Sequence, residues 1–160
     1  MPFYRFHIDV DAPPQVVAER LRSVVRRKPT FWESLGETGW STDSAGVPFI
    51  GCVGDNSFKI QRNIAHRNSF LPVVWGRLIS TATGARVCVT MVIHPTTALF
   101  MTLWLGAAAF VAVSSRSASP IFPCGMFILG VLGMVGFFFP EAMKAKCLIS
   151  DAVTSPAVSV

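Results

Sequence analysis

Apolar and polar residues change their spacing along the chain, and this change separates a folded domain from a pair of long apolar segments. Residues 3–10 alternate between apolar and polar side chains, which predicts a half-buried β-strand. The next apolar positions have helical spacing and predict an amphipathic helix that begins after Asp11 as its N-cap and ends near Arg27. The stripe of this helix consists of Val17, Leu21, Val24 and Val25.

Four more strands are predicted between this helix and Pro95, each bounded by turn residues. They cover residues 47–53, 58–64, 70–80 and 85–94. One helix laid across an antiparallel sheet is a common α+β arrangement. We therefore expect residues 1–95 to form a cytoplasmic α+β domain in the order strand, helix and a four-strand antiparallel meander.

Two segments without any charged residue follow, over residues 96–113 and 121–139. As helices they would be about 27 and 28 Å long, close to the thickness of a bilayer core. A polar loop of residues 114–120 joins them. Helices that are apolar on every side need partners all round, and the rest of this small chain could hardly supply them. Residues 96–139 are thus predicted to form a transmembrane helical hairpin.

Residues 140–160 are expected to form an amphipathic helix and a tail. Met143, Cys147 and either Leu148 or Ile149 fall on one stripe of this helix. Two arrangements remain open at this stage, because the segment could prolong the second spanning helix past Pro140 or bend onto the membrane surface.

Small residues suggest how the two apolar helices pack. Gly106 and Ala109 on the first, with Gly130 and Gly133 on the second, would allow close backbone approach in lipid. The spacing G-x-x-x-G does not occur, so we expect packing within the hairpin in preference to a dedicated dimer motif.

Charge adds an orientation to this picture. The chain carries a net charge of +5, but charged residues make up only 14% of it, against about 25% in a typical soluble domain. Arg77 and Arg86 precede the hairpin, Lys144 and Lys146 follow it, and only Arg116 lies in its loop. The positive-inside rule then predicts a multi-pass protein of the cell (inner) membrane with both termini in the cytoplasm.

Motifs for chemistry or nucleic-acid binding are not found. The four cysteines are far apart and the three histidines do not have the spacing of metal ligands, so no metal, cofactor or catalytic site is predicted. The sequence also lacks G-x-S-x-G and a phosphate-binding glycine loop, and we expect the protein not to be an enzyme. The basic residues form neither a dense patch nor a known nucleic-acid module.

Four residues are the exposed candidates for binding. Arginine binds phosphate with two hydrogen bonds and tryptophan favours the membrane interface, so Arg62, Arg67, Trp75 and Arg77 could contact lipid headgroups or a partner. The alternative is that these residues are solvated and only anchor the domain beside the membrane.

A resemblance to known proteins rests on three short stretches, on Gly76 and on the two-helix hairpin. The stretches are FIGCV at 49–53, FKIQR at 58–62 and RNSFLP at 67–72. Over residues 45 to 150 the chain resembles a group of small uncharacterised bacterial membrane proteins. This resemblance implies the same topology and no particular activity.

These observations predict a small integral membrane protein that acts as an accessory, assembly or docking subunit at the cytoplasmic membrane surface. Membrane lipid and a protein partner or larger membrane complex are its expected partners. One alternative is a membrane-anchored module that binds a phospholipid or an isoprenoid in a pocket between helix and sheet. Another is an immunity protein that intercepts a membrane-directed toxin.

Overall fold

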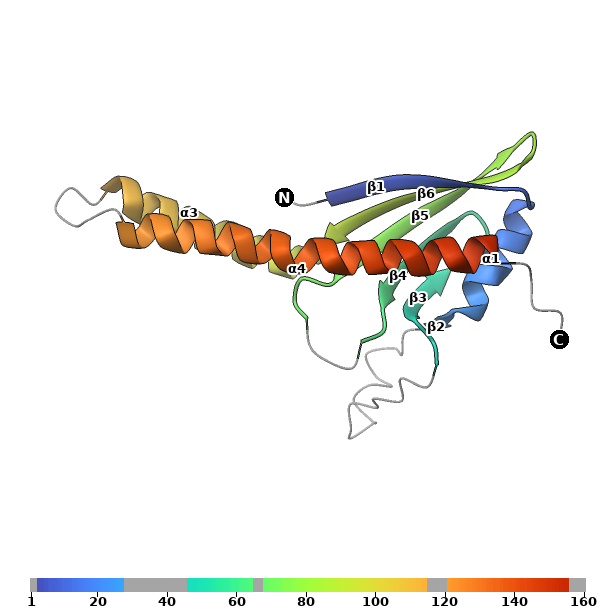
Figure 1. Ribbon diagram of the computed structural model, residues 1–160, viewed down its shortest axis with the longest axis horizontal. Helices are drawn as coiled ribbons and strands as arrows, with labels where there is room; N and C mark the ends of the chain where they lie inside the picture. The colour runs from blue at the N-terminus through green and yellow to red at the C-terminus, as the bar shows by residue number, and fades with distance from the viewer. Residues whose placement is uncertain (1–2, 28–45, 65–67, 115–120, 156–160) are drawn as a thin grey trace.

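The computed structural model describes residues 3–27, 46–64, 68–114 and 121–155. It has an α+β architecture, as predicted, with a six-stranded mixed sheet, a short helix and two long helices that extend from the sheet (Figure 1). The elements are β1 (Phe3–Val10), α1 (Pro14–Ser23), β2 (Val25–Arg27), β3 (Phe49–Val53), β4 (Ser57–Arg62), β5 (Pro72–Thr81), β6 (Gly84–Ile93), α3 (Pro95–Ser114) and α4 (Ile121–Thr154).

The sheet has the strand order β1-β6-β5-β4-β3-β2. From β3 to β6 each strand pairs antiparallel with the next, so the predicted four-strand meander is confirmed. The N-terminal strand β1 returns to pair with β6, where Phe3 lies opposite Val92 and Val10 opposite Ala85. The last strand of the domain therefore lies in the sheet interior and continues directly into α3.

The predicted end of the first helix is wrong. α1 ends at Ser23, and residues 25–27 form β2, which pairs in parallel with β3 and makes the sheet mixed. Hydrogen bonding to the distant strand outweighs the helical spacing that continues through Val24 and Val25. Asp11 is not the N-cap either, because α1 begins at Pro14, follows Pro13 and has no side-chain cap.

The second long helix does not end at Pro140. α4 runs for 34 residues, about 51 Å, and its C-terminal half lies across the sheet beside α1. Its buried positions there are fully enclosed against residues of the sheet and of α1. They are Phe138, Ala142, Ala145, Ile149 and Val153.

The apolar stripe predicted for this part of the chain is therefore wrong in part. Ile149 is buried, but Met143 and Cys147 are exposed on the other side of α4. Two of the buried positions, Ala142 and Ala145, have small side chains, which let the helix approach the strands closely there.

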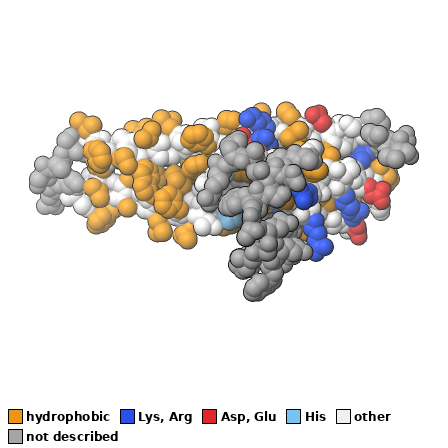
Figure 2. All heavy atoms as spheres, turned by 90° about the horizontal axis from the view of Figure 1, so that it is seen from below, with side chains coloured by type: hydrophobic (Ala, Val, Ile, Leu, Met, Phe, Trp, Pro, Cys, Tyr) orange, Lys and Arg blue, Asp and Glu red, His pale blue; other side chains and the backbone are white. Residues whose placement is uncertain are grey.

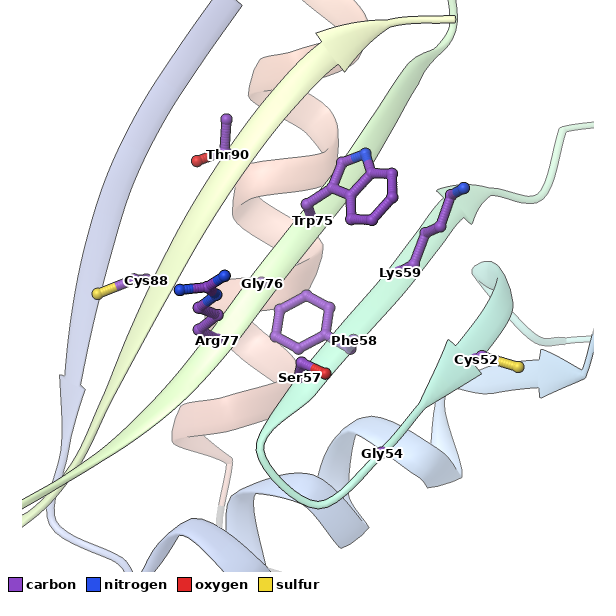
Figure 3. Close-up of a pocket in the computed structure, with 10 residues that line it drawn as sticks. All are labelled: Cys52, Gly54, Ser57, Phe58, Lys59, Trp75, Gly76, Arg77, Cys88 and Thr90. Atoms are coloured by element: carbon purple, nitrogen blue, oxygen red, sulfur yellow. The ribbon is translucent and has the colours of Figure 1, made fainter.

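The sheet consequently has two different faces. The covered face packs against α1 and α4 and includes Phe58, Ile60 and Val74, all almost completely buried. Alternate residues of the same strands, such as Lys59 and Trp75, point to the opposite side, which we call the open face. In Figure 3 this face is toward the viewer and α4 passes behind the sheet.

Candidate functional site

The helical hairpin, formed by α3 and the first part of α4, has an apolar surface. Both helices are long and apolar enough to cross a membrane, and only 6% and 11% of their most apolar stretches are buried. Core helices of a soluble domain would be mostly buried, so the exposure of Phe110, Phe122 and Leu129 is typical of contact with lipid. In Figure 2 hydrophobic side chains cover the hairpin, while charged side chains gather over the sheet end of the molecule.

Packing inside the hairpin involves one of the four predicted small residues. Gly130 lies directly under the indole of Trp104, where a Cβ atom would have no room. Gly133 has open space at the Cβ position, and Gly106 and Ala109 are exposed. The structure thus places one predicted glycine at the contact and leaves the other three outside it.

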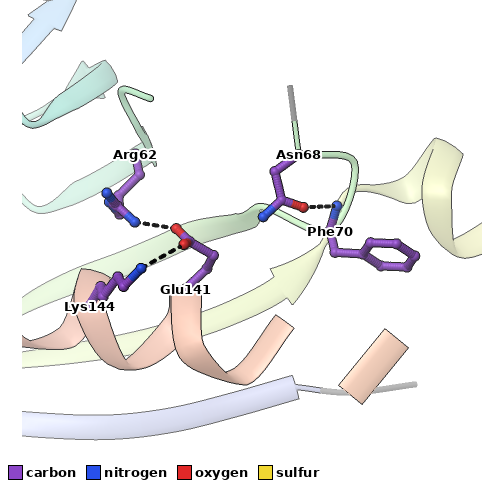
Figure 4. A network of polar contacts seen from close by, with 5 residues as sticks. All are labelled: Arg62, Asn68, Phe70, Glu141 and Lys144. Atoms are coloured by element: carbon purple, nitrogen blue, oxygen red, sulfur yellow. Dashed lines mark hydrogen bonds and ion pairs between the residues drawn. The ribbon is translucent and has the colours of Figure 1, made fainter. Parts of the chain in front are cut away.

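An ion-pair cluster lies where the hairpin meets the sheet (Figure 4). Glu141, the first residue after Pro140, is 7% exposed and accepts hydrogen bonds from Arg62 of β4 and from Lys144 one turn later in α4. The Arg62 side chain is also largely buried, whereas that of Lys144 is mostly exposed. A buried carboxylate next to a buried guanidinium fixes α4 to β4 at this junction.

The loop before β5 adds two further contacts to this junction. Phe70 stacks on Phe137 of α4 with ring centroids 5.9 Å apart. The Thr97 hydroxyl of α3 donates a hydrogen bond to the Ser69 carbonyl oxygen at 2.8 Å. Both apolar helices are therefore held to the sheet domain by side chains, in addition to the direct chain connection.

More contacts hold the far part of α4. Lys146 donates a hydrogen bond to the Tyr4 hydroxyl of β1 at 3.1 Å and lies over the Phe6 ring. Arg20 of α1 donates to the Val153 carbonyl oxygen at 2.8 Å, in the last turn of α4. A cation at the C-terminal end of a helix donates a hydrogen bond to an unpaired carbonyl group and interacts favourably with the negative end of the helix dipole.

The open face carries a groove of about 660 Å³ (Figure 3). Strand register brings its residues into rows, with Lys59 opposite Trp75, Trp75 opposite Thr90, and Arg77 opposite Cys88. The Lys59 ammonium lies 4.3 Å from the centre of the Trp75 ring, and the indole is still 49% exposed.

Charge on the open face is mostly positive. By register, the described residues of this face include five basic side chains and one acidic side chain, Asp9. The basic ones are Arg5, Arg26, Lys59, Arg77 and Arg86. Arg86 donates two hydrogen bonds to Asp9, and these bonds together with its charge lower the pKa of the Asp9 carboxyl and raise that of the guanidinium.

The four predicted contact residues do not form one cluster. Trp75 and Arg77 lie together in the groove of the open face. Arg62 lies on the other side of the sheet, bound to Glu141, and Arg67 is outside the described residues. The alternation of β4 already placed Arg62 with Phe58 and Ile60, and that signal could have identified its side of the sheet.

Sequence reasoning missed Lys59 and Glu141. Lys59 belongs to the groove because of its register with Trp75, which no local pattern reveals. Glu141 could have been noticed as an acid that directly follows an uncharged segment and Pro140. Within the described residues, no group of three or more His, Cys, Asp or Glu side chains could hold a metal ion.

Comparisons with known proteins identify no relative of established function. No protein-family model matches the chain, and no curated protein sequence matches it. A solved structure that resembles it is the crystal structure of protein MLL2253 from Mesorhizobium loti, with 13% identity over 84% of this chain and 97% of that one. Its TM-score is 0.35. The resemblance to small bacterial membrane proteins stays a prediction.

Proposed function

We propose that this chain is a small integral membrane protein that acts as a docking or accessory subunit. In this proposal the hairpin crosses the bilayer and holds the sheet at the cytoplasmic surface, where the open face receives a protein partner. The observation that carries it is the double role of α4, whose first half exposes apolar side chains and whose second half is part of the sheet's core.

The contacts at the junction support a fixed position for the sheet. The sheet domain has little freedom to move relative to the hairpin, because α4 joins the two without a linker. The Arg62–Glu141 pair and the Phe70–Phe137 stack hold the same junction. A domain that only needed tethering could use a flexible linker. Rigid attachment therefore favours presentation of a surface in one orientation.

The same geometry supports a multi-pass topology with both termini on one side. α3 leaves the sheet and α4 returns to it, so the sheet domain and the C-terminal half of α4 lie at the same end of the hairpin (Figure 1). Arg77, Arg86, Lys144 and Lys146 are at this end, which the positive-inside rule assigns to the cytoplasm of the cell membrane.

Integration and sidedness are tested first. We expect the full-length protein to stay in the membrane pellet after alkaline extraction of cells. In a variant whose other cysteines are replaced by serine, Cys52, exposed on the open face, should react with a membrane-impermeant maleimide only after the cells are permeabilised. Extraction into the soluble fraction, or labelling in intact cells, would contradict the proposal.

Docking is tested by cross-linking inside the cell. A photoreactive phenylalanine analogue at Ile79, which is 49% exposed on the open face, should give a discrete adduct with one protein. The same analogue at Met143, exposed on the outer side of α4, serves as the control and should not give that adduct. Equal adducts at the two positions, or none at Ile79, would count against a docking role.

The two alternatives predicted from the sequence have no observation of their own. A lipid pocket between helix and sheet would lie where Val17, Leu21 and Ile149 are fully buried against each other and the strands. The groove found here lies on the other side of the sheet. A role in toxin immunity likewise stays a prediction.

A further inference from the structure

The open face combines three features in one place. It has a groove of about 660 Å³, a half-exposed indole, and cations on both sides of it. Among the described residues, the side chains of Arg77 and Lys59 make no ion pair or hydrogen bond, and the Lys59 ammonium lies over the Trp75 ring. No acidic side chain is found among the described residues that line the groove.

The Arg77 end of the groove lies farther from the hairpin than lipid headgroups reach. The strands run obliquely to α4, and the sheet extends away from the hairpin along the second half of this helix (Figure 1). Counted from Ile93 along β6, the Trp75 row is about 10 Å and the Arg77 row about 17 Å away. The headgroup layer on one side of a bilayer is only about 5–8 Å thick.

A second copy of the chain is also a poor occupant. Two copies inserted in the same direction could bring their open faces together only around an axis normal to the membrane. Each face would then meet another with the same excess of basic residues, and like charges across an interface cost several kcal/mol. The complementary ligand is one that brings negative charge.

We propose that the open face binds an acidic segment of a partner protein. Carboxylates of this segment pair with Lys59 and Arg77, and an apolar or aromatic side chain packs on the exposed part of Trp75. The inference rests on the docking function proposed above and specifies the chemistry of its partner.

The test uses the full-length protein in nanodiscs of neutral phosphatidylcholine. The probe is a short fluorescent peptide in which Glu alternates with Ser around a central Phe, and its twin has Gln in place of every Glu. We expect the Glu peptide to bind more tightly by fluorescence anisotropy, with an affinity that falls as salt is added. The variant Arg77→Glu should weaken binding by at least about tenfold.

The matched control is Arg27→Glu, which makes the same change in net charge at a residue of β2 that does not line the groove and that strand alternation turns away from the open face. It should retain the binding of the unmodified protein. Equal binding of the Glu and Gln peptides, or an equal loss in the Arg27 and Arg77 variants, would overturn the inference.

Contact of the open face with the membrane is tested separately, with bromine-labelled phosphatidylglycerol in the nanodisc. Bromine quenches tryptophan in or next to the bilayer. In a background in which Trp32 and Trp40 are replaced by Phe, we expect the quenching to disappear with Trp104→Phe and to persist with Trp75→Phe; the reverse result would overturn the inference.

These results are separable from the docking proposal itself. An in-cell adduct at Ile79 without any preference for the acidic peptide would refute only the acidic partner. Failure of membrane integration would refute the proposed function whatever the peptide does.

Discussion

The two halves of α4 belong to one continuous helix and have opposite surroundings. Residues 121–139 carry no charge, and large side chains such as Phe122 and Leu129 are 76% and 66% exposed. Residues 140–154 include four charged side chains, yet Ala145 and Ile149 are completely buried. The more hydrophobic half is thus the more exposed one, and average hydrophobicity alone would predict the opposite.

The distribution of apolar residues around the helix explains the difference. The first half is apolar on every side, as a helix in lipid must be. The second half has one apolar face, which a sheet can cover, and a polar face for water. A single helix can therefore carry two kinds of surface, and α4 continues through Pro140 at the boundary between them.

The ion pair at this boundary gives the largest expected effect. Glu141→Ala leaves the largely buried Arg62 without its partner, and we expect unfolding of the sheet domain to become easier by about 3–5 kcal/mol. Thermal unfolding in detergent, followed by circular dichroism, measures it. The control Lys144→Ala removes the exposed partner and should cost less than about 1 kcal/mol. Equal costs would show that α4 is not fixed through Arg62.

A charge placed in each half tests the two surroundings directly. Leu129→Arg puts a cation near the middle of the exposed apolar half, and we expect it to disfavour membrane insertion by about 2.5–3.5 kcal/mol. Met143→Arg makes the same kind of change at a half-exposed position of the second half and should be tolerated. The fraction of protein resistant to alkaline extraction distinguishes them. Equal retention of both variants would remove the distinction between the halves.

A smaller effect comes from deleting one methylene in each half. Ile149→Val opens space in the closed core and should destabilise the sheet domain by about 0.5–1.5 kcal/mol. Ile128→Val, at a 57% exposed position, should change the same unfolding transition very little. Chemical denaturation in mild detergent compares the two. A larger cost at Ile128 would mean that the hairpin is packed against protein.

The sequence was sufficient where a local pattern decides the structure. Alternation located β1 and the meander, and the uncharged stretches located the two long helices. β2 was missed because three residues carry little pattern and its pairing with Phe49–Gly51 is set by distant residues. The predicted stripe of α4 was wrong in part because alanines occupy two of the buried positions, while Met143 and Cys147 are larger but exposed.

The candidate site was predictable to a smaller extent. Trp75 and Arg77 were identified from their chemistry and do lie together. Lys59 lies beside them only because of cross-strand register. Arg62 lies on the other face of the sheet because strand alternation turns its side chain toward α4. Residue types indicate what a surface could bind, but the faces of the sheet determine which of them act together.

The smallest expected effect concerns the open face, where Arg86 and Asp9 are paired in solvent. Because Arg86 lowers the pKa of Asp9 in the folded state, the pair stabilises the fold above the ordinary aspartate range, and the contribution disappears as pH falls through the lowered pKa. We expect Arg86→Gln to lower the unfolding temperature slightly at neutral pH and not at all in strong acid. Added salt should shrink the difference at neutral pH, since both groups are exposed. If the difference in unfolding temperature persisted in acid, the Arg86 side chain would stabilise the fold through packing. The expectation that its charge dominates at this position of the open face would then be wrong.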